Sequence, residues 1–162
     1  MPYLLDANVF IQAKNLHYGL DFCPGFWDWL IVNNMASQVF SIEKVGDELK
    51  AGADELADWA KKMDDSFFLK PDNAILPALR QVSVWATTQN YDPAAVSIFL
   101  QIADYYLVAH ALARGFTVVT HEIASASTRK IKIPDACIGA GIKFMTPFEM
   151  LKVERARFVL KQ

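Results

Sequence analysis

Short apolar runs and longer stripes of apolar residues at helical spacing alternate along the chain. Apolar, β-branched runs bounded by turn residues are typical of buried strands, and they predict strands at residues 3–5, 39–41, 67–69, 116–120 and 142–145. Between them, apolar residues recur at the spacing of one helix face, most clearly from Asp104 to Gly115. Strands that alternate with helices favour an α/β fold with a mainly parallel sheet covered on both faces.

Capping residues mark several helix ends. Ser41 precedes a helical stripe and is predicted to cap that helix, Gly115 is predicted to end another, and Thr146 to begin the last. The polar segment from His121 to Lys132 has no such pattern and is predicted to be a loop.

The composition is that of an ordinary globular domain. The chain has 162 residues, of which 53% are hydrophobic and 21% charged, and 16 basic against 18 acidic side chains give a net charge of −2. This length favours one domain over residues 1–162, and the composition excludes a disordered chain. A net charge of −2 does not argue against nucleic acid, since acids gathered around a metal would mask a basic rim.

Two cysteines, Cys23 and Cys137, are too few for a disulfide framework, and they lack the spacing of a zinc site. We predict that they are buried or half-buried packing residues. The chain has no signal peptide pattern and no apolar run of the ~20 residues that span a bilayer, so we expect a cytoplasmic protein with no membrane partner.

Four acids are predicted to converge on one edge of the sheet. Asp6 ends the first strand, and Glu122 follows the strand that ends at Thr120. The carboxyl ends of parallel strands lie at the same edge, where open α/β sheets bind ligands. Asp104 starts a helix on its apolar stripe, and Glu48 is predicted to lie on the inward side of its own helix.

Acids in this arrangement are typical of a cation site. Unpaired carboxylates raise one another's pKa values and cost stability unless an ion binds them. Oxygen ligands suit Mg²⁺ or Mn²⁺, and such ions activate water for phosphodiester hydrolysis. Taken singly, each acid has a plainer interpretation: Asp104 would be a helix cap, and Glu48 a solvated residue at the rim of its helix.

Basic residues near this edge are candidates for contact with phosphates. Arg129, Lys130 and Lys132 lie in the predicted loop after the fourth strand, where they would position a nucleic acid backbone without reading its bases. The alternative for each residue is an ordinary solvating charge. His110 is expected to pack or to face solvent.

At these residues the chain resembles the PIN-domain family of metal-dependent ribonucleases, which includes toxins of bacterial toxin–antitoxin pairs. The matching segments are Leu5–Asn8, Val45–Leu49, Ala103–Ala111 and Gly115–Glu122. The resemblance implies a three-layer α/β/α sandwich and a Mg²⁺ or Mn²⁺ pocket made of the four acids. It also implies that Asn8 and Thr120 orient metal-bound water.

The chain departs from the family pattern at the fourth acid, where Glu122 stands in place of the usual Asp. Asp135, in a segment similar to one branch of the family, would either join the site or cap the short helix that follows. We predict capping.

The resemblance implies an endoribonuclease with an RNA substrate, and it allows a toxin with an antitoxin protein partner and a homodimer. The alternative is a non-catalytic PIN-like binding module with a vestigial acidic pocket. A phosphatase of the haloacid-dehalogenase type is disfavoured, because Asn8 stands where that chemistry needs a second acid.

Overall fold

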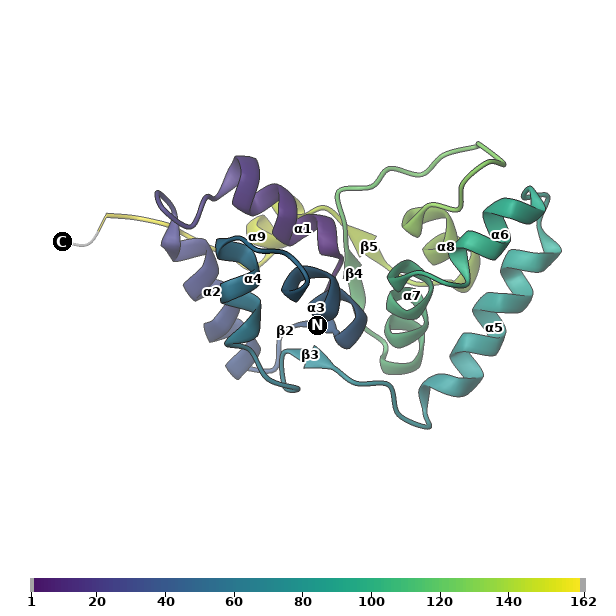
Figure 1. The fold of residues 1–162 in the computed structure, drawn as a ribbon, viewed down its shortest axis with the longest axis horizontal. Coiled ribbons are helices and arrows are strands. Elements are labelled where there is room, and N and C mark those ends of the chain that lie inside the picture. The colour runs from purple at the N-terminus through teal and green to yellow at the C-terminus, as the bar shows by residue number, and fades with distance from the viewer. Residues whose placement is uncertain (1, 161–162) are drawn as a thin grey trace.

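In the computed structural model, which describes residues 2–160, five short strands form one parallel sheet (Figure 1). The strands are β1 (Tyr3–Leu5), β2 (Val39–Ile42), β3 (Phe68–Leu69), β4 (Thr117–Val119) and β5 (Phe144–Met145). Their order across the sheet is β3-β2-β1-β4-β5, and every neighbouring pair is parallel. The α/β class with a parallel sheet is confirmed.

Helices connect the strands and cover both faces of the sheet. They are α1 (Ala7–Gln12), which continues as the π-helical segment η1 (Ala13–His17), α2 (Pro24–Met35), α3 (Glu43–Lys50), α4 (Glu55–Lys61), α5 (Ile75–Thr88), α6 (Pro93–Phe99), α7 (Ala103–Arg114), α8 (Ile133–Ala140) and α9 (Pro147–Val153). Figure 1 shows α2, α4 and α9 on one side of the strands and α5 to α8 on the other. This is the predicted three-layer sandwich.

The central strands β1 and β4 are buried because both faces of the sheet are covered. Tyr3, Leu4 and Leu5 of the central strand are 3%, 0% and 0% exposed, as expected for a parallel sheet whose strands carry continuous apolar runs. Aromatic side chains fill part of this core, with Phe10 packed against Trp59 at a ring distance of 5.8 Å.

The strand order reverses between β1 and β4, and this reversal creates the crevice where ligands bind in open α/β sheets. From β1 the chain adds β2 and β3 on one side, and β4 and β5 then form on the other. Leu5 pairs with Val119, and the N–H of Asp6 donates to the carbonyl oxygen of Val119 at 2.9 Å. The residues that follow β1 and β4 therefore leave the sheet side by side.

Two predicted helix ends are confirmed. Gly115 ends α7 in the left-handed conformation with φ of 72°, which glycine adopts without steric cost. Thr146 begins α9 in a capping box with Glu149. The segment from His121 to Lys132 contains no helix or strand.

The predicted capping role of Ser41 is wrong. Ser41 lies within β2, and Ile42 occupies the N-cap position of α3. The buried hydroxyl of Ser41 donates to the carbonyl oxygen of Leu5 at 2.6 Å. The Ser41 hydroxyl thus forms a hydrogen bond with the neighbouring strand and not with the first turn of α3. This bond connects β2 to the end of β1.

Within residues 2–160, no single helix is long and apolar enough to cross a membrane. The helices α6 and α7 are long and apolar enough for a membrane span only when they are counted as one, and they are bent by 67° with respect to one another.

Candidate functional site

Asp6 and Thr120 meet at the carboxyl edge of the two central strands. Asp6 follows β1 and is 6% exposed, and Thr120 follows β4 and is 1% exposed. The Thr120 hydroxyl donates to Oδ2 of Asp6 at 2.9 Å and accepts the backbone N–H of Glu122 at 3.0 Å. Thr120 therefore holds the first acid and the backbone of the fourth in a fixed relation.

Asp104 and Glu48 face a hollow beside this edge. The hollow has a volume of about 470 Å³ and lies between the side chains of α3 and the start of α7. Its lining residues are Lys44, Asp47, Glu48, Gln101, Ile102, Ala103 and Asp104. Asp47 and Gln101 were not predicted as site residues, since an exposed polar residue has no sequence signal that separates it from other surface positions.

Neighbouring acids raise the pKa values of Asp6 and Asp104. Burial and then the nearby charge of Asp104 raise the pKa of Asp6 to about 7, with a smaller rise from Glu122 and an opposing effect of the Thr120 hydrogen bond. Burial and then the charge of Glu122 raise the pKa of Asp104 to about 6, with a further rise from Glu48. Acids of like charge are thus brought together at this edge of the sheet. The positive charge of Lys130 opposes the rise in the pKa of Asp104 but does not cancel it.

The predicted inward position of Glu48 is wrong. On α3, Val45 and Leu49 are buried, and Glu48 is exposed. Its carboxylate nevertheless lies near Asp104, whose pKa it raises. The apolar side chains of Val45 and Leu49 occupy the buried face of α3, so Glu48 lies at its edge and faces the hollow from the rim.

Glu122 is tied to the start of α8. Its Oε2 accepts the backbone N–H of Ile133 at 2.8 Å, an N–H in the first turn of that helix that has no partner within the helix. The longer side chain of Glu, compared with the usual Asp, is therefore used to reach across the loop.

Asp135 does not cap α8, contrary to the prediction. Lys132 is at the cap position, and Asp135 lies inside the first turn. Its carboxylate accepts the backbone N–H of Ser125, at 3.1 Å from Oδ2. Asp135 therefore anchors the loop that carries Arg129 and Lys130.

Three rings lie beside the acids. The side-chain oxygen of Asn8 accepts the backbone N–H of His121 at 3.3 Å. The ring of His121 lies 5.4 Å from that of His17 and 5.5 Å from that of Phe148. Burial, with a contribution from His17, lowers the pKa of His121. These rings come from three distant parts of the chain, so no sequence pattern predicts the cluster.

His110 and Cys137 are packing residues, as predicted. His110 is 1% exposed and accepts a hydrogen bond from Nε of Arg114 at 3.4 Å, and burial, followed by the charge of Arg114, lowers its pKa to about 4. Burial, followed by the charges of Asp6 and Glu122, raises the pKa of Cys137 to about 12. The Cys137 thiol is therefore protonated and unreactive at neutral pH.

Among the predicted basic residues, Lys130 is close enough to the acids for its charge to act on one of them. Its charge lowers the pKa of Asp104 against the effect of burial. Arg129 and Lys130 are exposed, and Lys132 is half-buried. On the other side of the hollow, the ammonium group of Lys44 lies 4.3 Å from the ring centroid of Tyr106, a cation–π contact that leaves Lys44 at the rim.

The donor types fit a hard divalent cation, but the donors are not assembled around one point. Carboxylate oxygens are the ligands that Mg²⁺ and Mn²⁺ prefer, and the raised pKa values of Asp6 and Asp104 are those of acids that a cation would stabilise. Within residues 2–160, no group of three or more His, Cys, Asp or Glu side chains is arranged to hold a metal ion as it stands. Glu122 bound to Ile133 and Glu48 at the rim account for this spacing.

Comparison with solved structures gives two similar chains. The crystal structure of FitAcB from Neisseria gonorrhoeae is similar with a TM-score of 0.52 and 17% identity, over 90% of this chain and 98% of that chain. The crystal structure of VapBC2 from Rickettsia felis bound to a DNA fragment from their promoter is similar with a TM-score of 0.48 and 18% identity, over the same shares. The FitAcB likeness confirms the predicted PIN-like fold.

Comparison of the sequence with curated proteins finds no match. A family model described as "Domain of unknown function (DUF4411)" matches residues 3–158, nearly the whole chain. The chain therefore belongs to the DUF4411 family, with the fold of the PIN-domain proteins.

Proposed function

We propose that this protein is a Mg²⁺- or Mn²⁺-dependent nuclease that cleaves RNA. The observation that carries the proposal is the pair of acids Asp6 and Asp104 at the switch point of the sheet, with Glu122 and Glu48 close enough to act on them. Asp6 and Asp104 have pKa values raised to about 7 and about 6 by burial and by neighbouring acids. Perturbed pKa values beside a hollow are typical of functional sites.

The residues of the chain have separable tasks in this proposal. Asp6, Glu48, Asp104 and Glu122 would hold the ion, which would lower the pKa of a water molecule and neutralise charge on the phosphoryl group. Thr120 orients Asp6 through its hydroxyl, and Asn8 holds the backbone at His121. Lys130 and Arg129 would contact phosphates of the substrate.

The resemblance to the PIN-domain toxins supports a narrower role as the toxin of a toxin–antitoxin pair, with an antitoxin protein as its partner. In that case the antitoxin would cover the hollow or hold its acids apart. We also propose that the chain acts inside the cell, where both partners would meet.

A binding module without catalysis is the second candidate, and one observation favours it. The carboxylates are not assembled for an ion as they stand, and Glu122 is engaged by a backbone N–H. The acid edge would then bind a partner and no metal. Metal binding separates the two candidates.

The first test is thermal unfolding with and without Mn²⁺, on the wild type, Asp6→Asn and the exposed control Asp28→Asn. A cation that binds only the folded state raises its stability by mass action, by about 2.7 kcal/mol at a hundred times Kd. We expect a rise in melting temperature in the wild type and the control that is absent in Asp6→Asn. Equal behaviour of all three proteins would favour the binding module.

The second test is cleavage of a single-stranded RNA in Mn²⁺ by the wild type and by Asp104→Asn. We expect the variant to lose more than about a hundredfold in rate, since even the supporting partner of a ligand is worth up to about that factor. The variant should fold normally, because the substitution removes a half-buried charge. An unfolded Asp104→Asn would show that Asp104 is structural.

A further inference from the structure

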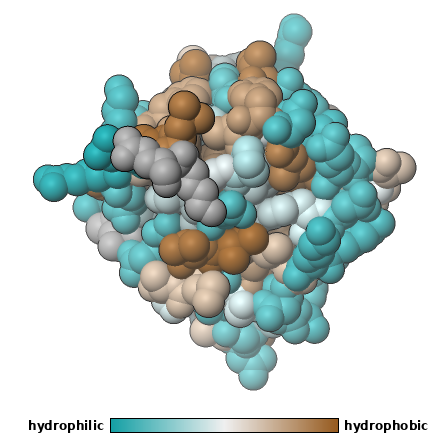
Figure 2. Space-filling model, turned by 90° about the vertical axis from the view of Figure 1, so that its left-hand side faces the viewer, coloured by the Kyte–Doolittle hydropathy of each residue, from teal (hydrophilic) through white to brown (hydrophobic). Residues whose placement is uncertain are grey.

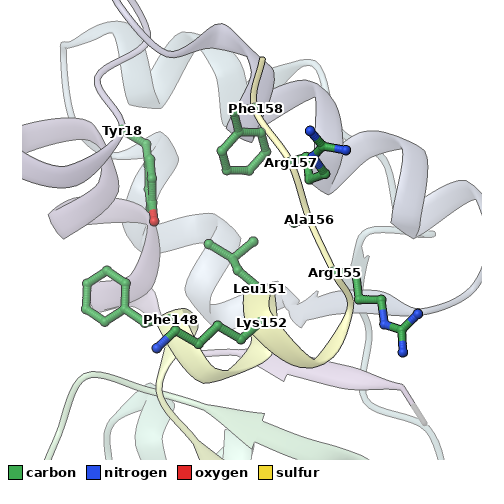
Figure 3. A pocket seen from close by; sticks show the side chains of 8 residues that line it. All are labelled: Tyr18, Phe148, Leu151, Lys152, Arg155, Ala156, Arg157 and Phe158. Carbon is green, nitrogen blue, oxygen red and sulfur yellow. The ribbon is translucent and has the colours of Figure 1, made fainter.

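A second hollow lies on the other side of the His17, His121 and Phe148 rings. It has a volume of about 450 Å³ and is formed by the end of η1, by α9 and by the segment that follows α9. Figure 3 shows the rings of Tyr18, Phe148 and Phe158 around it, with Leu151 at its base.

The rings of this hollow continue the cluster at the acid edge. Phe148 lies 5.5 Å from His121 and 4.9 Å from His17, measured between ring centroids. His17 lies 6.2 Å from Tyr18, and Tyr18 lies 5.8 Å from Phe158. All five rings are partly exposed. A row of partly exposed rings therefore runs from the neighbour of Glu122 to the segment after α9. One face of Tyr18 is covered, because that ring stacks on the buried Phe26 at 4.6 Å between centroids, so His17, His121 and Phe148 are the rings that lie free of this stack.

Three cationic side chains border the same hollow: Lys152, Arg155 and Arg157. In Figure 3, Lys152 extends along α9 with its ammonium group near Phe148, whereas the guanidinium groups of Arg155 and Arg157 lie across the C-terminal segment and point away from the rings. Among residues 2–160, none of the three forms an ion pair. Figure 2 shows that this end of the molecule presents apolar patches separated by hydrophilic surface.

Arg155 adopts a backbone conformation that favours glycine. Its φ is 54°, and it ends α9 with a hydrogen bond from the N–H of Ala156 to the carbonyl oxygen of Leu151 at 2.9 Å. Glycine is the usual residue at this position of a helix end. Arg155 therefore has a strained backbone beside the hollow. Residues with such backbone strain are often found at functional sites.

We propose that this hollow and the ring row bind the part of a single-stranded RNA that flanks the cleaved bond. Accessible rings on which bases stack, bordered by cations that contact phosphates, are the means by which proteins bind single strands. Among residues 2–160, no acid lines the hollow, which matches a polyanion. The position of the cleaved bond relative to the hollow rests on the proposed nuclease function. The binding of RNA by the hollow does not depend on that function.

The test is the affinity of a labelled, unstructured RNA of about 12 nucleotides, measured by fluorescence anisotropy on full-length Asp104→Asn protein so that the RNA stays intact. One variant adds Lys152→Ala, Arg155→Gly and Arg157→Ala. The control adds Lys61→Ala, Lys62→Ala and Arg80→Ala, three exposed cations on α4, after it and on α5, which give the same change of net charge.

We expect the hollow variant to bind about tenfold more weakly or worse, and the slope of log Kd against log salt to fall by about 2 for three lost phosphate contacts. Phe148→Leu should weaken binding by about fivefold to a hundredfold, and Phe148→Trp should retain it, because stacking needs a ring. Arg155→Gly alone should keep or raise the melting temperature, which separates binding from folding.

Equal affinities and salt slopes in the hollow variant and the control would overturn the inference. Cleavage of a short oligonucleotide by the Asp104-containing protein distinguishes this failure from failure of the nuclease function. If that protein cleaves RNA and the hollow variant binds like the control, only the hollow is wrong. If no RNA is cleaved but the hollow variant loses affinity, the RNA-binding hollow stands without the nuclease.

Discussion

Thr120 shows how one buried hydroxyl organises the acid edge. It donates to Asp6 and accepts the N–H of Glu122, so that one side chain fixes the residues after both central strands. The resemblance to PIN domains implied a role in orienting metal-bound water. In the structure the hydroxyl proton goes to Asp6, and Thr120 acts through that acid.

Replacing Thr120 with Val keeps the shape of the side chain and removes both hydrogen bonds. We expect Thr120→Val to weaken Mn²⁺ binding and cleavage by about tenfold to a hundredfold, and to lower stability by about 1–3 kcal/mol, since the N–H of Glu122 loses its partner. Titration with Mn²⁺ followed by melting temperature measures the first effect. Thr120→Ser is the control, and a loss as large as that of Val would mean that the methyl group matters more than the hydroxyl.

The pKa of Asp6 predicts how the stability of the metal-free protein depends on pH. Its ordinary value is 3.8 and its folded value is about 7. Between these values the folded state binds more protons than the unfolded state, so stability falls as pH rises through that window. Between pH 4 and pH 8, the free energy of unfolding of Asp6→Asn should therefore rise relative to that of the wild type by about 2–4 kcal/mol.

Urea unfolding at several pH values measures this difference. His110, whose pKa is lowered to about 4, acts in the opposite direction, because its unfolded form takes up a proton as pH falls below 6.5. Both proteins contain His110, so its effect cancels in the comparison. A difference between wild type and Asp6→Asn that does not change with pH would show that Asp6 titrates normally.

Among the helices, α5 and α8 pack closely against each other through Trp85 and Gly139. A Cβ atom at Gly139 would lie 2.0 Å from Nε1 of Trp85, so the indole ring packs directly on the backbone of α8. The same helix begins at Ile133, which binds Glu122. The packing of α8 thereby supports the position of the fourth acid.

We expect Gly139→Ala to destabilise the protein by about 1–3 kcal/mol, because the indole must move from its contact with Tyr91. Chemical unfolding of the variant measures the loss. Ile138→Ala, at the exposed neighbouring position, should change stability by less than about 0.5 kcal/mol. A Gly139→Ala variant as stable as the wild type would show that Trp85 relocates without cost.

At the scale of the whole molecule, the distribution of charge matters more than its sum. The net charge of −2 combines acids at the carboxyl edge of the sheet with Arg129 and Lys130 on one flank and Lys152, Arg155 and Arg157 at the second hollow. Such a distribution suits a polyanion that crosses an acidic centre once a cation neutralises it.

The fold also predicts which parts open first. The central strands are paired on both sides, and their residues are buried, whereas most residues from Ile123 to Lys130 are exposed and outside any helix or strand. We expect the amides of β1 and β4 to exchange with solvent only on global unfolding, and those of residues 123–130 to exchange fastest. Hydrogen exchange followed by mass spectrometry tests this order, and protection of residues 123–130 comparable to β1 would contradict it.

Local sequence patterns were enough to predict the strands, most helices and the acids at the ends of β1 and β4. Continuous apolar runs at β1 and β4 require burial on both faces, and this alone predicts a parallel sheet with Asp6 and Glu122 at one edge. Gly115 and Thr146 marked helix ends correctly because their signals act within a single turn of backbone.

The contacts of side chains between elements could not be predicted from local patterns, because they depend on how distant segments pack. Ser41 forms a hydrogen bond with the neighbouring strand and not with its own helix, and Glu48 is exposed because its apolar neighbours occupy the interior. Asp135 holds the loop at Ser125, and the rings of His17, His121 and Phe148 meet from distant segments. A local pattern carries the preference of a residue for a backbone shape or for burial, but its partner is selected by the packing of distant segments.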